Sequence, residues 1–462
     1  MKKRYVLATI AALIILYIVI ALWPYTGRVY VTAETKLAFN MQNFFGDYQS
    51  PERVMLVECP QDAFFHRLLL ISNAQEEILL SSFAIHRGET SDIIAGALLA
   101  AADRGVQISI LSNSIGGTIS RRYANVLAAH NNINVYMFNR LNFLEPQFIN
   151  ASMHDKYMIV DDTFLILGGR NIGDKYYAPE GFTGRLSLDR EVLVYNTDPT
   201  FQGSIADVRQ YFTGKITSYR ATVRNVESNS RLEAQKNDFI GLYESHIQTL
   251  ETRAFDYYYN TVGVNRITLI SNPTDTTRKE SIVAYNLMML TQNSQTIIAQ
   301  SPYVVLTRRN LETFAQTVYG RDFTLLTNSL ASTPNLPAFS AYHVTRRNIL
   351  ATGITIYEFQ STDVSVHAKT YLFDGRLTAI GSFNLNERSL RADTETMLII
   401  DSEAFHDIVL AAINDQMAQS LRVGQDNRYI PNSAVEAAHT PMFKRGLFRM
   451  AGHALRPFRF MF

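Results

Sequence analysis

The chain repeats one pattern of polar residues, and this duplication constrains its fold more than any other feature. The segments HDKYMIVDDTFLILGGRN and HAKTYLFDGRLTAIGSFN begin at His154 and His367. In both, His-x-Lys is followed after four residues by Asp, and later by Gly-Gly-x-Asn or Gly-Ser-x-Asn. Outside the motifs, GVQISILSNSI from Gly105 aligns with GRDFTLLTNSL from Gly320 without a gap. Matches at a nearly constant separation indicate an internal duplication, so we predict two copies of one domain.

Strand-like and helical segments alternate within the first copy, which predicts an α/β fold. Its strands are expected at 77–85, 106–113, 133–139, 156–162 and 191–196. An Ala-rich helix at 91–105 is predicted to stop at its terminal glycine. We expect the first domain at 55–214 and the second at 266–425. The polar, partly helical segment 215–265 is predicted to bridge the two domains.

The N-terminus is predicted to anchor the chain in a membrane. The residues from Tyr5 to Trp23 carry no charge, and as a helix they would span about 28 Å, close to the thickness of a bilayer's hydrocarbon core. No small-residue cleavage site precedes Pro24, which favours an uncleaved anchor at 1–25 over a signal peptide. The basic residues before the apolar run predict a single pass with the catalytic domains on the non-cytoplasmic face of the cell membrane. A tether is expected at 26–54.

The last segment, 426–462, ends in MFKRGLFRMAGHALRPFRFMF, where basic residues alternate with aromatic and aliphatic ones and no acidic residue occurs. Such a tail can lie on an anionic lipid surface. The alternatives are a helix packed on the domain or a disordered end.

Composition excludes some classes of function. The formal net charge is only +1, so no nucleic-acid partner attracted by bulk charge is expected. The single cysteine cannot form an intramolecular disulfide, and thiolate-ligated metal sites need more than one.

The duplicated motif brings together groups that suit a phosphate diester. Residues two apart in a strand point to the same side, which places each motif histidine beside its lysine. These catalytic candidates are His154, Lys156, His367 and Lys369. Three side chains after the motif strands could donate hydrogen bonds to phosphate oxygens: Asn171, Ser382 and Asn384. One imidazole could attack phosphorus while the other protonates the leaving alcohol. No metal ion or other cofactor is expected, because the lysines already supply positive charge.

The motif glycines and carboxylates have different expected roles. Three glycines are expected to let a ligand approach the backbone: Gly168, Gly169 and Gly381. The motif aspartates, Asp161 and Asp374, are assigned to turns. Asp374 precedes Gly375, and Asp-Gly between strands is a hairpin signal, while Asp161-Asp162 occupies the equivalent place in the first motif. A carboxylate is also needed behind each histidine to hold its tautomer. The candidates are Glu191 for the first motif and Glu395 for the second, with Asp189 as the rival of Glu191.

These motifs resemble the phospholipase D superfamily, whose signature is this duplicated His-x-Lys pattern with its following Gly-Gly/Ser-x-Asn. The segments GGRNIGDKYY, GSFNLNERSLRADTE and AADRGVQISIL resemble the bacterial cardiolipin synthase branch. The resemblance implies two tandem α/β/α sandwich domains, related by a pseudo-two-fold axis, with one active site between them. It also implies that His154 is the nucleophile and His367 the acid and base.

The resemblance implies a phosphatidyltransferase that acts on phosphatidylglycerol, with phosphatidylethanolamine as a possible donor lipid. Hydrolysis to phosphatidic acid is an alternative, because water could replace the alcohol. Cleavage of single-stranded nucleic acid is a second alternative, and an inactive membrane scaffold is a third. The near-neutral charge disfavours nucleic acid, and the intact motif residues of both halves disfavour the scaffold.

Overall fold

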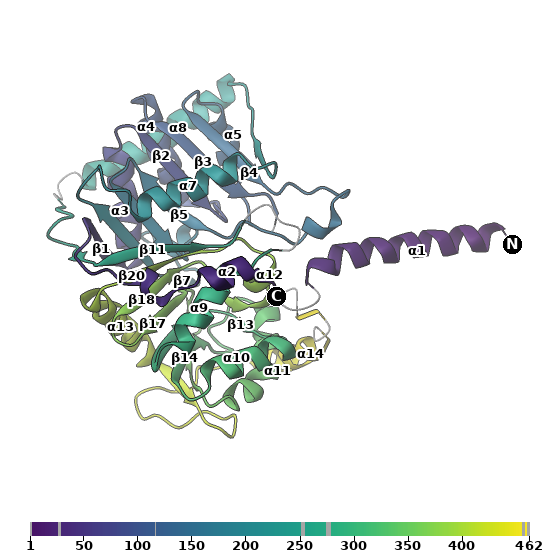
Figure 1. The fold of residues 1–462 in the computed structure, drawn as a ribbon. Coiled ribbons are helices and arrows are strands. Elements are labelled where there is room, and N and C mark those ends of the chain that lie inside the picture. Colours follow the sequence, from purple (N-terminus) through teal and green to yellow (C-terminus); the bar gives the residue numbers. More distant parts are fainter. Residues whose placement is uncertain are drawn as a thin grey trace.

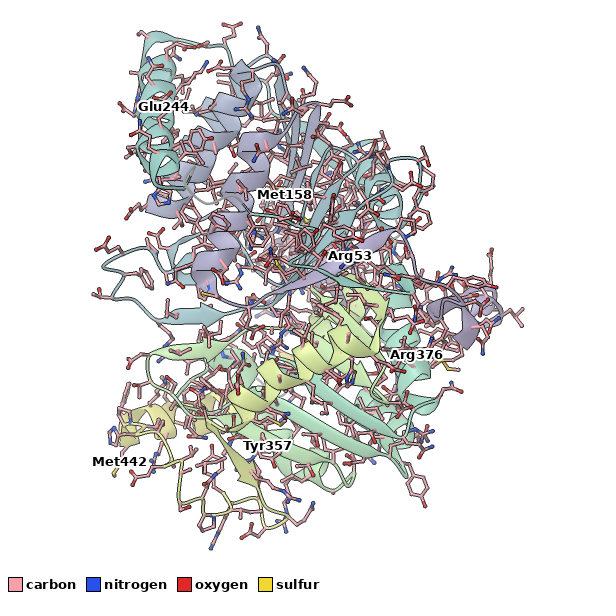
Figure 2. All side chains as sticks on the ribbon, turned by 90° about the vertical axis from the view of Figure 1, so that its left-hand side faces the viewer. Arg53, Met158, Glu244, Tyr357, Arg376 and Met442 are labelled. Atoms are coloured by element: carbon pink, nitrogen blue, oxygen red, sulfur yellow. The ribbon has the colours of Figure 1, made fainter. Side chains whose placement is uncertain are left out.

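Two large sheets, one from each copy of the repeat, form the centre of the molecule (Figure 1). The computed structural model describes residues 2–25, 29–115, 117–250, 255–273, 279–454 and 458–459. Figure 2 shows the same two-domain arrangement after a turn of 90°, with Met158 and Glu244 in the first domain and Tyr357 and Met442 in the second.

The first sheet has nine strands in the order β10-β1-β8-β6-β5-β2-β3-β4-β9. Their bounds are β1 (Glu52–Val57), β2 (Glu77–Ser82), β3 (Gln107–Asn113), β4 (Ile133–Phe138), β5 (Lys156–Val160), β6 (Phe164–Gly168), β8 (Glu191–Asn196), β9 (Ala221–Val223) and β10 (Val262–Gly263). Only β2, β3 and β4 pair in parallel. The strands expected from the sequence therefore form one mixed sheet.

The second sheet has eight strands in the order β11-β20-β18-β17-β12-β14-β15-β21. Their bounds are β11 (Arg266–Ser271), β12 (Thr296–Gln300), β14 (Asp322–Asn328), β15 (Thr355–Phe359), β17 (Thr370–Phe373), β18 (Leu377–Gly381), β20 (Thr396–Asp401) and β21 (Ser420–Val423). Here β12, β14 and β15 are the parallel strands. The central order matches that of the first sheet, which confirms the predicted duplication.

Helices cover the outer face of each sheet (Figure 1). Those of the first domain are α3 (Pro60–Asn73), α4 (Glu89–Asp103), α5 (Arg121–Ala128) and α8 (Ser230–Leu250), and their apolar faces close one core. Those of the second domain are α9 (Ile282–Gln292), α10 (Arg308–Val318), α11 (Leu336–Leu350) and α14 (Met442–Ala454), and they close another.

A third core lies between the two sheets and is built from both domains. It includes the buried faces of α7 (Ser204–Ile216) and α13 (Glu403–Met417). The contacts are reciprocal: α7 contacts β11, and its counterpart α13 contacts β1. Equivalent elements that exchange places across an interface are the mark of a two-fold relation. The expected pair of α/β/α domains is thus confirmed, and the halves share their inner layer.

Two short parallel ladders complete the connections. One joins β7 (Leu186–Leu188) of the first half to β16 (Val364–Val366) of the second, so main-chain hydrogen bonds cross between the domains. The other, β13 (Val304–Val305) with β19 (Leu385–Asn386), lies within the second half.

The segment 215–265 is not a separate bridge, as the sequence suggested. It supplies β9, β10 and α8 to the first domain, and buried residues of α8 such as Phe239 belong to that domain's core. Its polar composition suggested a segment outside the domains. A surface helix, however, needs only one apolar face to pack on a domain. The expected tether also packs: it contains α2 (Ala33–Ala38) and the short helix η2 (Met41–Phe44), and Phe44 is buried in the second domain's core.

The N-terminal helix α1 (Lys2–Leu22) projects away from the body of the molecule (Figure 1). Its segment Arg4–Leu22 is long and apolar enough to cross a membrane, and none of it is buried against the protein. An apolar helix that finds no core of its own protein needs an apolar environment elsewhere, which agrees with the predicted anchor.

Glycines at the ends of β6 and β18 allow their neighbouring strands to approach closely. A Cβ atom on Gly168 would lie 2.3 Å from the carbonyl oxygen of Arg190, and one on Gly381 would lie 2.1 Å from that of Thr396. These glycines were expected to make room for a ligand. The space beside them is instead filled by the adjacent strand.

Candidate active site

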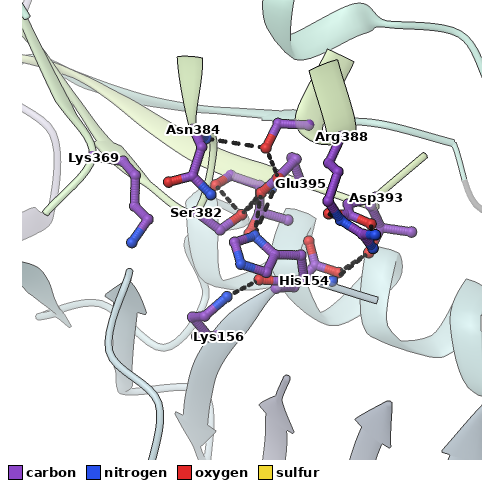
Figure 3. Close-up of polar contacts among 12 residues, drawn as sticks. His154, Lys156, Lys369, Ser382, Asn384, Arg388, Asp393 and Glu395 are labelled. Atoms are coloured by element: carbon purple, nitrogen blue, oxygen red, sulfur yellow. Dashed lines mark hydrogen bonds and ion pairs between the residues drawn. The ribbon is translucent and has the colours of Figure 1, made fainter. Parts of the chain in front are cut away.

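The two His-x-Lys motifs meet between the domains. His154 and Lys156 lie at the start of β5, and His367 and Lys369 lie between β16 and β17. Figure 3 shows His154 between Lys156 and Glu395, with Lys369 on the opposite side. His367 lies beside Lys369, whose Nζ is 2.8 Å from its Nδ1. All four motif side chains expected from the sequence therefore come together.

Each histidine is held by a carboxylate from the other half of the chain. Nδ1 of His154 lies 3.1 Å from both carboxylate oxygens of Glu395 (Figure 3). Nδ1 of His367 lies 2.5 Å from Oδ2 of Asp189. A neutral imidazole that donates from Nδ1 presents an unprotonated Nε2, which is the form needed for attack on phosphorus.

This crossed arrangement corrects two expectations. Glu395 orients His154, not the histidine of its own motif. Glu191 orients neither histidine, because its carboxylate accepts hydrogen bonds from Arg67 and Arg170 in the buried interior of the first domain. Asp189, considered as its rival, pairs with a histidine, but with the one in the second half.

The Gly-Gly and Gly-Ser variants of the motif match these different carboxylates. The hydroxyl of Ser382 donates to Glu395, and it accepts from the backbone N–H of Thr396 at 3.0 Å. In this structure Ser382 therefore supports the carboxylate, and its expected contact with phosphate stays a prediction. At the equivalent Gly169, a Cβ atom would lie 2.3 Å from Oδ1 of Asp189. Only glycine leaves room for this shorter carboxylate.

The two motif asparagines keep free polar atoms in the site. Nδ2 of Asn171 donates to the hydroxyl of Tyr176 at 3.0 Å. Among the described residues, Oδ1 of Asn171 and Oδ1 of Asn384 are buried without a hydrogen-bond partner. Buried polar atoms normally have partners, so these two acceptor oxygens beside the motif histidines are available to a ligand that donates a hydrogen bond, such as an alcohol.

Both motif lysines are buried, and Lys156 lies close to the positively charged ammonium group of Lys369. Burial, together with nearby Lys369, lowers the pKa of Lys156 to about 7. Burial lowers the pKa of Lys369 to about 8. Each ammonium donates to the carbonyl oxygen of its own motif histidine. Two cations held in a poorly solvated site favour an anionic ligand that would restore the balance of charge.

Both motif histidines are neutral at physiological pH. Burial and Lys156 hold the pKa of His154 well below its usual range. Burial and Lys369 lower the pKa of His367 to about 3.

The carboxylates behind the histidines differ in charge state. Burial alone would raise the pKa of Asp189, but Lys369 and His367 outweigh it and hold this pKa at about 2. Burial raises the pKa of Glu395 to about 7. The environment therefore keeps Asp189 ionised across the physiological range but lets Glu395 titrate near neutral pH.

Aromatic side chains surround the histidines, and the motif pattern did not reveal them. Phe83 packs edge-on against His154 at 5.1 Å between ring centroids. Tyr176 and Tyr303 pack against His367 at 5.8 and 6.0 Å. Both tyrosines and His367 line a pocket of about 440 Å³, a size within the usual range for small-molecule sites.

A buried ion pair beside the first motif was also missed. Asp155, the middle residue of the first His-x-Lys, binds Lys215 of α7 and accepts from Oγ1 of Thr394 at 2.5 Å. The carbonyl oxygen of Thr394 accepts from the backbone N–H of His154 at 3.3 Å. The available signal was the difference between the motifs at this position, which is Asp155 in the first and Ala368 in the second.

The motif aspartates lie in the hairpin turns, as the turn pattern predicts. Asp161 and Asp374 both have left-handed backbone conformations, with φ of 52° and 48°. The carboxylate of Asp161 accepts from three backbone N–H groups at 75–77, and that of Asp374 accepts from two at 295–296. Both tie their hairpin to the start of the neighbouring strand. Among the described residues, no cluster of three or more His, Cys, Asp or Glu side chains could hold a metal ion.

Comparison with known proteins gives a consistent result. The family model described as cardiolipin synthase, PLD-like domain, matches residues 68–214 and 287–418. An uncharacterized protein of Helicobacter pylori is 28% identical over 400 residues, which cover 79% of this chain and 79% of that protein. Cardiolipin synthase C of Escherichia coli is 26% identical over 389 residues, which cover 75% of this chain and 81% of that protein.

A solved structure shares the fold. The crystal structure of phosphatidylserine synthase from Haemophilus influenzae superimposes with a TM-score of 0.63 at 14% identity. The match covers 93% of this chain and all of that one. At this identity the likeness concerns the fold alone.

The crossed pairing predicts different effects for two neighbouring acids. Asp189→Asn should lower kcat on phosphate diesters by about 10²–10⁴-fold, the usual contribution of general acid–base catalysis, because His367 loses its charged partner. Glu191→Gln should instead lower the melting temperature, because it leaves Arg67 and Arg170 underpaired in the interior. Steady-state kinetics and thermal unfolding of both variants would check this. A larger kcat loss in Glu191→Gln, with its melting temperature unchanged, would contradict the assignment.

Proposed function

Because the chain belongs to the cardiolipin synthase family of phospholipase D-like domains, we propose that it transfers a phosphatidyl group to a hydroxyl of phosphatidylglycerol, giving cardiolipin and a released alcohol. The observation that carries this proposal is the crossed pair of histidine–carboxylate contacts beside two buried lysines. Phosphatidylethanolamine or a second phosphatidylglycerol is the proposed donor lipid.

In the first half-reaction, Nε2 of His154 attacks the donor's phosphorus. A P–N bond forms, the P–O bond to the head-group alcohol breaks, and His367 gives its proton to the departing oxygen. His367 has to be protonated for this step. A bound diester brings negative charge beside the ring and offsets Lys369, so binding raises the pKa of the imidazole toward the working range.

In the second half-reaction, neutral His367 removes the proton from the acceptor hydroxyl. The acceptor oxygen attacks phosphorus, the P–N bond breaks, and His154 returns to its starting form. Asp189, ionised throughout, stabilises the imidazolium that forms on His367. The pocket on the His367 side supports this assignment, because leaving and entering alcohols must reach the acid and base.

Positive charge and hydrogen-bond donors would stabilise the transition state. Lys156 and Lys369 lie where the non-bridging oxygens of the phosphate would gather charge, and the amide N–H group of Asn384 can donate to them. The N–H group of Asn171 donates to Tyr176 in this structure and would have to turn to reach a phosphate. Such groups act strongly in a site from which water is excluded. All of them belong to the chain itself, so the proposed reaction needs no added cofactor.

The choice of alcohol over water is supported by the surroundings of the site. Tyr176 and Tyr303 wall the pocket with aromatic surface, and burial raises the pKa of both hydroxyls. The lining is mixed, because Lys175, Ser187 and Asn335 accompany the tyrosines. The preference for an alcohol over water therefore rests mainly on the nearness of a membrane. The helix α1 would hold this pocket at a membrane, where the lipid acceptor is concentrated. We propose that the catalytic domains lie on its non-cytoplasmic face.

The first test is lipid mass spectrometry of the detergent-purified chain mixed with phosphatidylglycerol, with and without phosphatidylethanolamine. We expect cardiolipin from the wild type and a loss of at least about 10³-fold in His154→Ala and His367→Ala, since each removes an obligatory group. Dependence on phosphatidylethanolamine would identify the donor. Phosphatidic acid alone would contradict the transfer reaction, and no product would contradict a lipid substrate.

A second experiment separates the two histidines. A phosphatidyl p-nitrophenyl ester has a leaving group that departs without a proton, so the first half-reaction no longer needs an acid. His367→Ala should release about one equivalent of nitrophenolate in a burst and then stall with the phosphatidyl group on His154. His154→Ala should give no burst. The opposite pattern in stopped-flow absorbance would show that the two roles are exchanged.

The pH profile should also reflect the buried groups. In the free enzyme, kcat/KM should fall above pH 7–8 as Lys156 and Lys369 lose their protons, because their pKa values are about 7 and 8. It should fall below about pH 7 as Glu395, with a pKa of about 7, gains a proton. A bound diester raises both lysine pKa values, so the alkaline limb of kcat should lie at higher pH. Identical alkaline limbs for kcat and kcat/KM would contradict this.

A further inference from the structure

The loop between β4 and the short helix η3 (Pro146–Phe148) exposes an unusual concentration of apolar side chains. Leu141, Phe143 and Leu144 are 50%, 67% and 91% exposed. Large aliphatic and aromatic residues rarely gather on the surface of a protein unless that surface binds something apolar.

This loop lies beside the membrane anchor. The helix α1 contacts η3, and Pro24, at the end of the anchor, lines a small cavity together with Phe148 of η3. Figure 1 shows the loop that follows β4 extending toward the side on which α1 projects. The exposed side chains therefore lie where the chain leaves the bilayer.

The helix α14 offers a second apolar surface on the same side (Figure 1). Phe448 is buried and packs edge-on against Phe339 of α11 at 5.5 Å between ring centroids. The opposite face exposes Met442, Phe443 and Met450 at 85%, 79% and 66%. The sequence suggested either a lipid-bound tail or a helix packed on the domain. The structure supports packing on one face and leaves the other face free.

Basic residues accompany both apolar surfaces. Arg140 precedes the loop and is exposed, and Lys444 and Arg445 lie on α14, half-buried and exposed respectively. Apolar side chains flanked by cations are the usual composition of a surface that inserts between anionic head groups.

Both surfaces are connected directly to the site. The loop continues into 150–153 and then His154, and Arg388 fastens this segment by donating to Asn150 at 2.6 Å and to Ser152 at 3.1 Å (Figure 3). On the other side, α11 carries α14 and begins at Leu336, which lines the His367 pocket. One apolar surface is thus linked to each histidine, the loop through the chain that leads to His154 and α14 through α11.

We propose that Leu141, Phe143 and Leu144, together with Met442, Phe443 and Met450, form a lipid-contact surface that inserts into the same membrane leaflet in which the anchor ends. The occupant is the bilayer, because the loop adjoins η3, which contacts α1, and because Lys444 and Arg445 add positive charge to the α14 part of the surface. This contact holds the mouth of the site against the leaflet, so that a lipid can reach the histidines without crossing water. The role of this membrane contact in lipid delivery rests on the proposed function, but the contact itself does not.

Tryptophan quenching tests the surface in the full-length chain. Trp23 is the single tryptophan, so Trp23→Phe provides a background into which Phe143→Trp or Phe443→Trp is introduced. The proteins are reconstituted in phosphatidylglycerol-containing vesicles whose acyl chains carry bromine. We expect strong quenching at positions 143 and 443.

The control is Tyr259→Trp in the same background, because Tyr259 is also an exposed aromatic residue, at 84%, and lies in a segment far from α1 in Figure 1. It should not be quenched, whereas Trp23 of the wild type should be. If Trp23 is quenched but position 143 or position 443 is not, the surface is wrong, and a protein contact at that position becomes the better explanation. Quenching needs no turnover, so this outcome is independent of whether cardiolipin is made.

Discussion

Two hydrogen bonds between an imidazole and a carboxylate of the opposite half are the interactions on which the rest of this structure depends. His154 is oriented by Glu395, and His367 by Asp189. Neither half contains a complete pair, so a site exists only when the halves are packed together. The apolar core shared by the two sheets and the β7–β16 ladder provide that packing. The duplication thus produces one site from two domains.

The same interface explains why the repeated motifs have diverged. In the second half, Ser382 supports a glutamate that reaches across to the first histidine. In the first half, Gly169 leaves space for the shorter aspartate. The two carboxylates also differ in pKa, about 7 for Glu395 and about 2 for Asp189. This difference fits two histidines with different tasks, because an acid and base needs a permanently charged partner more than a nucleophile does.

The site is connected to the side of the molecule from which the helix α1 projects. The segment that carries His154 emerges from a loop next to α1, and the pocket of His367 is lined by the start of α11, on which α14 packs. For the proposed lipid substrate this connection matters, because a lipid would enter from the membrane side. Part of the tether packs against the second domain, where Phe44 is buried in the core.

Sequence patterns alone predicted the repeat, the α/β alternation, the apolar anchor and the closeness of each motif histidine to a lysine. These predictions depend on local patterns. Residues two apart in a strand share a face, and Asp-Gly between two strands indicates a hairpin turn. Local patterns misplaced the segment 215–265, whose helix is apolar on one face only.

The pairing of each carboxylate with a histidine depends on how the two domains pack. Asp189 and Glu191 are two residues apart in one segment, yet the first reaches across the interface and the second binds two arginines of its own domain. Glu395 lies 241 residues from the histidine that it orients. A contact across that separation depends on how two complete domains pack, and no local pattern of residues encodes it.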